Sequence, residues 1–223
     1  MWILGVGGLF GYHFFYFMAL RNAPPIEAGL IAYLWPLLIV VFSALLPGER
    51  LRWYHMAGAL LGLGGSALLI TGGESLNFRP EYALGYAAAA ACALTWSGYS
   101  VFSRRFGHVK TDTVGWFCAA AAVLGLLAHL AFEKTIWPAD AGEWLAVLGL
   151  GLGPVGSAFF VWDYGVKRGN IQALGVASYA APLISTLLLV AFGAGEASWV
   201  VAVACAAIVG GALLASKEVM RGR

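Results

Sequence analysis

Aromatic and polar side chains recur at helical spacing inside the apolar stretches of this sequence. Tyr12 and Tyr16 are four residues apart, and His13 lies between them in the apolar run 1–20. Residues four apart share one face of a helix, so the two rings lie on a face that His13 borders. Aromatic rings stack against flat or apolar side chains, and a neutral histidine both donates and accepts a hydrogen bond. This face therefore predicts the binding of a small organic molecule.

Tyr12 and His13 each allow a second interpretation. Tyrosines also gather in belts at membrane surfaces, although Tyr12 lies about halfway along its run, too deep for such a belt. Ionisable groups near the middle of a membrane are costly and tend to be functional. His13 either binds the substrate or a neighbouring hydroxyl, or it takes up protons and couples transport to them.

A second group of candidates surrounds two prolines in the middle of apolar runs. Proline lacks an amide donor, so Pro36 and Pro182 can each bend a helix, either as a moving hinge or as a static kink. Trp35, beside Pro36, can stack on or gate a flat side chain. The other candidates near these prolines are Tyr33 and Tyr179, which are equally well hinge or packing residues, and Ser178, a weaker polar candidate.

The run 82–103 carries a polar and aromatic stripe at helical spacing, formed by Thr95, Trp96, Tyr99 and Ser103. Trp96 and Tyr99 are three residues apart, so both can face one cavity. The alternative is that the stripe forms a contact between helices.

Asp163 is a candidate gating residue, although an ion pair with Lys167, four residues further on, is the simpler explanation. The sequence indicates neither an enzyme nor a cofactor site. The G-x-G-x-x-G match at residues 151–156 lies inside an apolar run without a βαβ context, and no phosphate-binding loop or metal-ligand spacing is present. Basic residues are too few and too dispersed for nucleic-acid binding.

The elements that carry these residues are predicted to be membrane-spanning helices. The sequence is 61% hydrophobic and 11% charged, whereas soluble domains carry about 25% charged residues. Apolar runs near the ~20 residues that a spanning helix needs lie at residues 1–20, 25–46, 53–72, 82–103, 113–132, 143–166, 170–192 and 197–216. Strand-like alternation is absent, and only helices satisfy their own backbone in lipid without a closed barrel. We predict an all-α polytopic membrane protein, with eight helices in this chain.

The connections between successive helices are alternately rich and poor in lysine and arginine. One side carries Arg50, Arg52, Arg104, Arg105, Lys110, Lys167, Arg168, Lys217, Arg221 and Arg223, and the other carries Arg21, Arg79 and Lys134. Cytoplasmic connections carry the excess of positive charge. We therefore expect the first side, and with it the C-terminus, in the cytoplasm.

An internal repeat relates two parts of the chain at a constant offset of 146 residues: Phe14 matches Phe160, the segment 33–37 (YLWPL) matches 179–183 (YAAPL), and Gly64-Gly65 matches Gly210-Gly211. Duplicated helices in a membrane protein are typical of transporters, and broken helices at equivalent places often line the substrate site. The repeat predicts a first unit at 1–73, a second at 82–216 and a tail at 217–223. The second unit has two helices before its matched segment, so we expect about 65 further N-terminal residues with two helices, which would give two inverted five-helix repeats.

Two segments carry a resemblance to a known family. Residues 27–36 (EAGLIAYLWP) are similar to the E-x-G-x-x-x-Y-L-W-P stretch of aromatic amino-acid exporters, and residues 176–182 (VASYAAP) are similar to their second copy. By these residues the chain resembles the EamA-type drug/metabolite transporters, in which ten helices form two inverted five-helix repeats. The resemblance implies an inner-membrane exporter of amino acids, aromatic ones foremost and other neutral amino acids and related metabolites in addition. We expect a monomer that works by alternating access through a central cavity.

Two other functions stay open. Export of cationic aromatic drugs is the nearest alternative, although the scarcity of deep carboxylates argues against it. A membrane-embedded enzyme or lipid-handling protein needs a catalytic group near a membrane face, and the sequence shows none. We expect a small-molecule substrate and no cofactor, with transport that is either downhill or proton-linked.

Overall fold

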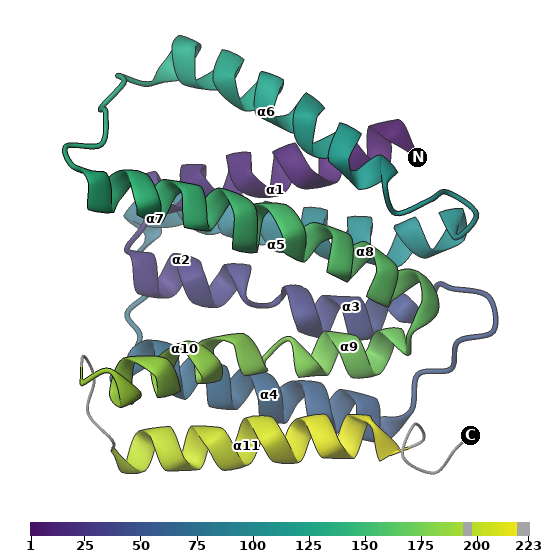
Figure 1. Ribbon diagram of the computed structural model, residues 1–223. Coiled ribbons are helices and arrows are strands. Elements are labelled where there is room, and N and C mark those ends of the chain that lie inside the picture. Colours follow the sequence, from purple (N-terminus) through teal and green to yellow (C-terminus); the bar gives the residue numbers. More distant parts are fainter. Residues whose placement is uncertain (194–197, 218–223) are drawn as a thin grey trace.

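The computed structural model describes residues 1–193 and 198–217, in which every long element is an α-helix. The helices lie side by side as a bundle (Figure 1). They run in chain order as α1 Trp2–Asn22, α2 Pro25–Ala32, α3 Trp35–Ser43, α4 Trp53–Thr71, α5 Ala83–Ser103, α6 Thr113–Phe132, α7 Ala141–Leu152, α8 Ala158–Arg168, α9 Ile171–Ala177, α10 Ala180–Ala191 and α11 Trp199–Ala215. Because α2 continues into α3, α7 into α8 and α9 into α10, the described residues form the eight predicted spans.

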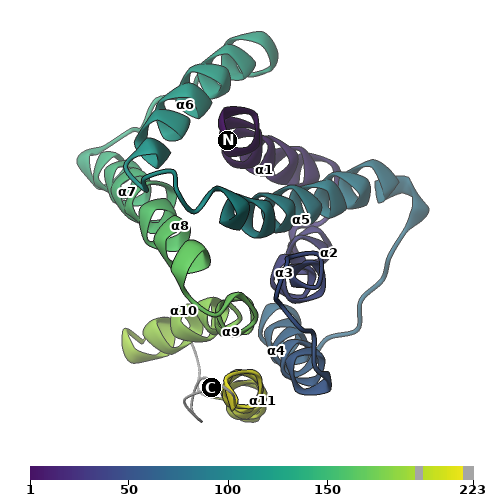
Figure 2. The same cartoon turned by 90° about the vertical axis from the view of Figure 1, so that its right-hand side faces the viewer.

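We call each of these eight units, whether one helix or two consecutive helices, a rod. Most rods have the length and apolar composition of a membrane span. Six rods in the described residues qualify by both criteria, and α11 is apolar but has 17 residues. The remaining rod, α5, has 21 residues, carries hydroxyl side chains along its length and is buried over about half of its residues. It lies between α1 and α3 (Figure 2). The chain is therefore a multi-pass membrane protein whose least lipid-like helix lies inside the bundle.

Two rods are broken at matching places. One break separates α2 from α3 at Tyr33 and Leu34, and the other separates α9 from α10 at Ser178 and Tyr179. In each case a proline follows within the first turn of the next helix, where its missing N–H removes no helical hydrogen bond. The predicted breaks are confirmed, and their motion during transport stays a prediction.

Helices that match in the sequence run in opposite directions. α1 matches α7–α8, α2–α3 matches α9–α10, and α4 matches α11 at the same offset. In Figure 1, α1 and α4 run away from the end that carries the N-terminus label, and their partners α7–α8 and α11 run towards it. In the third pair, α2–α3 run towards that end and α9–α10 run away from it. This is the arrangement that an inverted repeat requires.

The pair α4 and α11 packs at backbone distance. A Cβ built on Gly58 would lie 2.5 Å from the carbonyl oxygen of Gly211, and one built on Gly211 would lie 2.6 Å from the carbonyl oxygen of Gly58. Small residues allow membrane helices to approach this closely, and dispersion contacts then hold them together. The contact joins one helix of each repeat.

The connections rich in basic residues lie at one end of the bundle, together with the end of α11 (Figure 1). Of the predicted tail 217–223 only Lys217 is described, and Arg221 and Arg223 lie outside the described residues. The segregation of charge agrees with the predicted topology.

A set of polar side chains, here called the polar clamp, ties four segments together at this end. It consists of Glu49, Arg104 and Gln172. The guanidinium of Arg104 lies 3.0 Å from Glu49 and donates to the backbone carbonyls of Val166 (3.1 Å) and Gly169 (2.7 Å) at the end of α8. The amide of Gln172 donates to the other Glu49 oxygen at 3.0 Å. The clamp therefore joins the connection after α3 to the ends of α5 and α8 and to α9.

Candidate functional site

Trp96 of α5 lies at the centre of a group of aromatic rings contributed by four rods. Its ring centroid lies 5.2 Å from Tyr12, 5.4 Å from Tyr99, 5.5 Å from Phe159, 6.0 Å from Trp162 and 6.3 Å from Trp35. Tyr16 stacks on Tyr12 at 6.1 Å. We call Tyr12, His13, Tyr16, Trp35, Trp96, Tyr99, Phe159 and Trp162 the aromatic cluster. The predicted candidates from the first span, from the stripe on α5 and from Trp35 thus come together.

Phe159 and Trp162 of α8 also belong to the cluster, although they were not among the predicted site residues. They match His13 and Tyr16 at the repeat offset. Trp162 contacts the ring of Trp35 at 5.5 Å and donates its indole N–H to the hydroxyl of Ser100 at 2.9 Å. Both copies of the repeat therefore supply rings to the same place.

His13 lies at the edge of the aromatic cluster. Its ring makes edge contacts with Tyr12 at 5.1 Å and Phe159 at 5.8 Å. Nδ1 lies 2.8 Å from the carbonyl oxygen of Leu9, and because a carbonyl only accepts, Nδ1 carries a proton. In the neutral ring Nε2 is then an acceptor, and His13 is also a lining residue of the neighbouring cavity.

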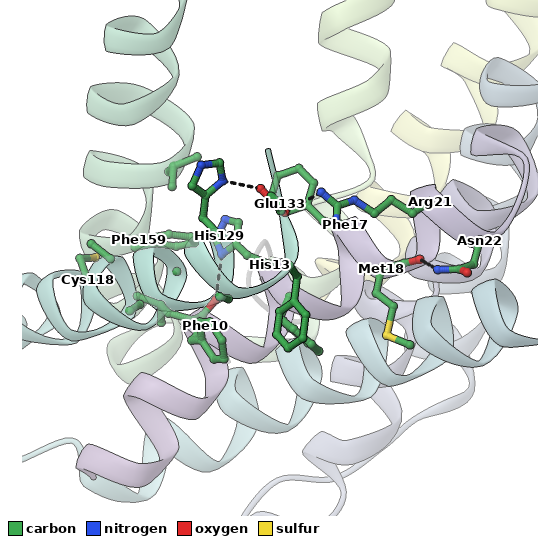
Figure 3. Close-up of a pocket in the computed structure, with 18 residues that line it drawn as sticks. Phe10, His13, Phe17, Met18, Arg21, Asn22, Cys118, His129, Glu133 and Phe159 are labelled. Carbon is green, nitrogen blue, oxygen red and sulfur yellow. Dashed lines mark hydrogen bonds and ion pairs between the residues drawn. The ribbon is translucent and has the colours of Figure 1, made fainter. Parts of the chain in front are cut away.

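That cavity, here called the α1–α6 cavity, has a volume of about 530 Å³ and lies beside α1, α6 and the start of α8 (Figure 3). Leu9, His13, Val155 and Phe159 form its inner end. Phenylalanines of α1 face small residues of α6 along its length, and the lining residues there include Phe10, Phe14, Phe17, Cys118, Ala121, Ala122, Gly125 and Ala128. The volume is in the usual range for small-molecule sites.

The outer end of the cavity carries charged groups that the sequence analysis missed. Arg21 donates to Glu133 at 2.6 Å, and Nδ1 of His129 donates to the other Glu133 oxygen at 2.6 Å (Figure 3). Nε2 of His129 lies 2.8 Å from the hydroxyl of Thr135. The hydrogen bond from His129 and the charge of Arg21 hold the pKa of Glu133 below its usual value. Only the four-residue spacing of His129 and Glu133 was visible in the sequence.

Three predicted candidates lie mainly in packing contacts. Tyr179 is fully buried, its hydroxyl accepts from the amide of Leu37 at 3.1 Å, and its ring lies against Gly62. The hydroxyl of Ser178 donates to the carbonyl of Leu174 at 2.8 Å. Tyr33 packs against the buried group of Tyr179, Leu183 and Ile208. Their contacts favour the hinge or packing interpretation, and substrate binding by them stays a prediction.

A comparison with family models decides the classification: the EamA-like transporter family matches residues 1–71 and 83–217. The chain belongs to the EamA-like transporter family.

Two relatives and one solved structure resemble this EamA-like transporter. It is 60% identical over 219 residues to the aromatic amino acid exporter YddG of Ancylobacter novellus. The aligned region covers 97% of this chain and 75% of that protein. It is 27% identical over 172 residues to the aromatic amino acid exporter YddG of Salmonella typhimurium, across 73% of this chain and 57% of that protein. A crystal structure with 60% sequence identity superposes with a TM-score of 0.92 and covers 96% of this chain and 76% of that one.

Asp163 of this EamA-like transporter lies on α8, next to Trp162 of the aromatic cluster, and forms an ion pair of its own. Its carboxylate lies 2.8 Å from the ammonium of Lys167 and accepts from the hydroxyl of Thr111 at 2.9 Å. Lys167 also donates to the carbonyl of Val109 at 3.0 Å. The predicted ion pair is confirmed, and a gating role for Asp163 stays a prediction.

Proposed function

We propose that this protein exports amino acids, aromatic ones foremost, across the inner membrane by alternating access through a path between its two repeats. The observation that carries the proposal is the aromatic cluster, in which both repeats surround Trp96 with rings 5.2–6.3 Å away. Offset and edge-to-face ring contacts favour flat aromatic ligands. Two relatives that bear the name aromatic amino acid exporter support the same substrate class.

The proposed organisation has a first repeat at residues 1–73, a second at 82–216 and a tail at 217–223, in a monomer whose C-terminus is cytoplasmic. The opposite directions of matched helices and the basic connections at one end support it. The substrate enters from the basic end, where the polar clamp lies, and leaves towards the end that carries Arg21.

Trp96→Ala tests the substrate site. Reconstituted transporter is expected to show a KM for phenylalanine raised about tenfold, because each lost aromatic contact is worth about 0.5–1.5 kcal/mol and Trp96 makes several. Trp116→Ala is the matched control, since Trp116 is 69% exposed on the outside of α6. Equal effects of the two substitutions on flux would contradict the proposed site.

Substrate class is tested by flux of phenylalanine, threonine and a cationic dye through the wild-type protein in liposomes. The aromatic cluster contains no carboxylate, which disfavours a dedicated cation site there. We expect phenylalanine to move fastest and the dye least. Flux of the dye alone would favour drug export instead.

His13→Gln tests whether the histidine binds substrate or carries protons. We propose binding, since Nδ1 is fixed by Leu9 and glutamine keeps one donor and one acceptor. The expected result is a raised KM with an unchanged pH profile of transport, and a larger rise in KM for His13→Ala. Loss of the pH dependence in both variants would assign proton coupling to His13.

A further inference from the structure

The outer end of the α1–α6 cavity holds one cation and one anion side by side. Arg21 lies in the last turn of α1 and Glu133 follows the last residue of α6, and both helices run in the same direction towards this end (Figure 1). Their side chains touch at 2.6 Å and keep 55% and 34% of their surfaces exposed. Both groups line the cavity and are reachable by a molecule inside it.

The charged end closes an otherwise apolar slot. Phe10, Phe14 and Phe17 of α1 and Ala121, Ala122 and Gly125 of α6 line it, and Phe14 and Phe17 lie between His13 and Arg21 along α1. A molecule that fits this arrangement carries a positive and a negative group on one end and an apolar body on the other. An amino acid with an aromatic or large apolar side chain has this distribution of charge and surface.

The Arg21–Glu133 pair is suited to exchange its partners. Exposed ion pairs contribute little to stability, so a ligand that replaces each partner loses little. Glu133 stays ionised at neutral pH, because His129 and Arg21 hold its pKa below the usual value. His129, itself in contact with Thr135, also fixes the direction of the carboxylate.

We propose that the α1–α6 cavity is a second, outer binding station for zwitterionic amino acids, in which Arg21 binds the α-carboxylate and Glu133 the α-ammonium. The apolar side chain lies among Phe10, Phe14 and Phe17. His13 and Phe159 belong both to this cavity and to the aromatic cluster, so the station adjoins the inner site. The inference rests on the proposed function, whose substrate it defines.

The test measures equilibrium binding to the purified full chain of three compounds: phenylalanine, phenethylamine, which lacks the carboxylate, and 3-phenylpropanoate, which lacks the ammonium. Arg21→Gln is expected to weaken binding of phenylalanine and 3-phenylpropanoate about tenfold, the size expected for a charge-assisted hydrogen bond, and to leave phenethylamine unchanged. Glu133→Gln is expected to weaken phenylalanine and phenethylamine and to leave 3-phenylpropanoate unchanged. Arg21→Lys should keep most of the affinity.

Arg79→Gln is the matched control, because Arg79 forms an exposed ion pair with Glu81 at 2.9 Å away from the cavity. Equal weakening of all three compounds by Arg21→Gln, or no weakening, would overturn the station and leave the pair a structural contact. Export of phenylalanine by the wild type and by Trp96→Ala is measured in parallel. Absence of wild-type export would contradict the proposed function, whereas normal export with uniform binding losses would contradict only the outer station.

Discussion

Replacing Gly58 with leucine is expected to separate α4 from α11 and to destabilise the transporter by more than about 3 kcal/mol. Added methylenes in a packed core already cost about 1–3 kcal/mol where neighbouring side chains can move. Here the neighbours are backbone, since a Cβ at position 58 would lie 2.5 Å from the carbonyl oxygen of Gly211 and 3.2 Å from the amide of Ala215. Backbone cannot rotate aside, so the helices themselves must part.

Thermal unfolding followed by fluorescence-detected size exclusion measures this effect. Gly64→Leu is the control on the same helix, because a Cβ at Gly64 meets no heavy atom within 4 Å. We expect Gly64→Leu to melt close to the wild-type temperature and Gly58→Leu to yield little monodisperse protein. A Gly58→Leu variant that melts like Gly64→Leu would show that the two helices do not depend on this contact.

Lys167→Met is expected to cost about 3–5 kcal/mol, because it leaves the carboxylate of Asp163 buried without its countercharge. The Asp163 side chain is 0% exposed and the Lys167 side chain is 4% exposed. The second Asp163 oxygen has no hydrogen-bond partner among the described residues, so the ammonium and the hydroxyl of Thr111 carry its stabilisation. Thermal unfolding provides the measurement.

The double variant Asp163→Asn with Lys167→Met isolates the buried charge. It is expected to recover much of the lost stability, since no unpaired charge remains. Arg168→Met is the matched control: Arg168 is the next residue, is exposed and lies over the ring of Tyr164 at 4.3 Å. If the double variant melted as low as Lys167→Met, lost packing rather than the stranded carboxylate would explain the result.

The sequence predicted the spans and the breaks because both follow from local chemistry. Runs of about 20 apolar residues define a span, and the breaks at Tyr33–Leu34 and Ser178–Tyr179 precede prolines at matched positions. The repeat implies five helices in each unit. Because five is odd, the second unit must cross the membrane in the opposite orientation to the first, which predicts the opposite directions of matched helices. These features need no knowledge of which helix touches which.

The site was predicted only where one helix carries it. Tyr12 with Tyr16, and Trp96 with Tyr99, share a face of their own helix, and the structure keeps each pair together. Phe159 and Trp162 were missed because their approach to Trp96 depends on how α8 packs on α5.

The charged groups at the outer end of the α1–α6 cavity were missed for a related reason. Arg21 and Glu133 are 112 residues apart and come together only because α1 and α6 run in parallel. Tyr179 was a candidate because both copies of the repeat keep a tyrosine there. Its burial against Gly62 depends on the path of α4, which no local pattern reports.

The polar clamp lies at the end of the bundle that carries the basic connections, so opening of this end exposes its polar groups to water. In the present arrangement Glu49 accepts from Arg104 and from the amide NH2 of Gln172, and Arg104 also donates to the carbonyls of Val166 and Gly169. Any rearrangement that draws α5 away from α9 strands a carboxylate, a guanidinium and an amide together, and such groups are costly without water or a new partner. We therefore expect water to enter that face as the helices part, because the separated groups need new hydrogen-bond partners.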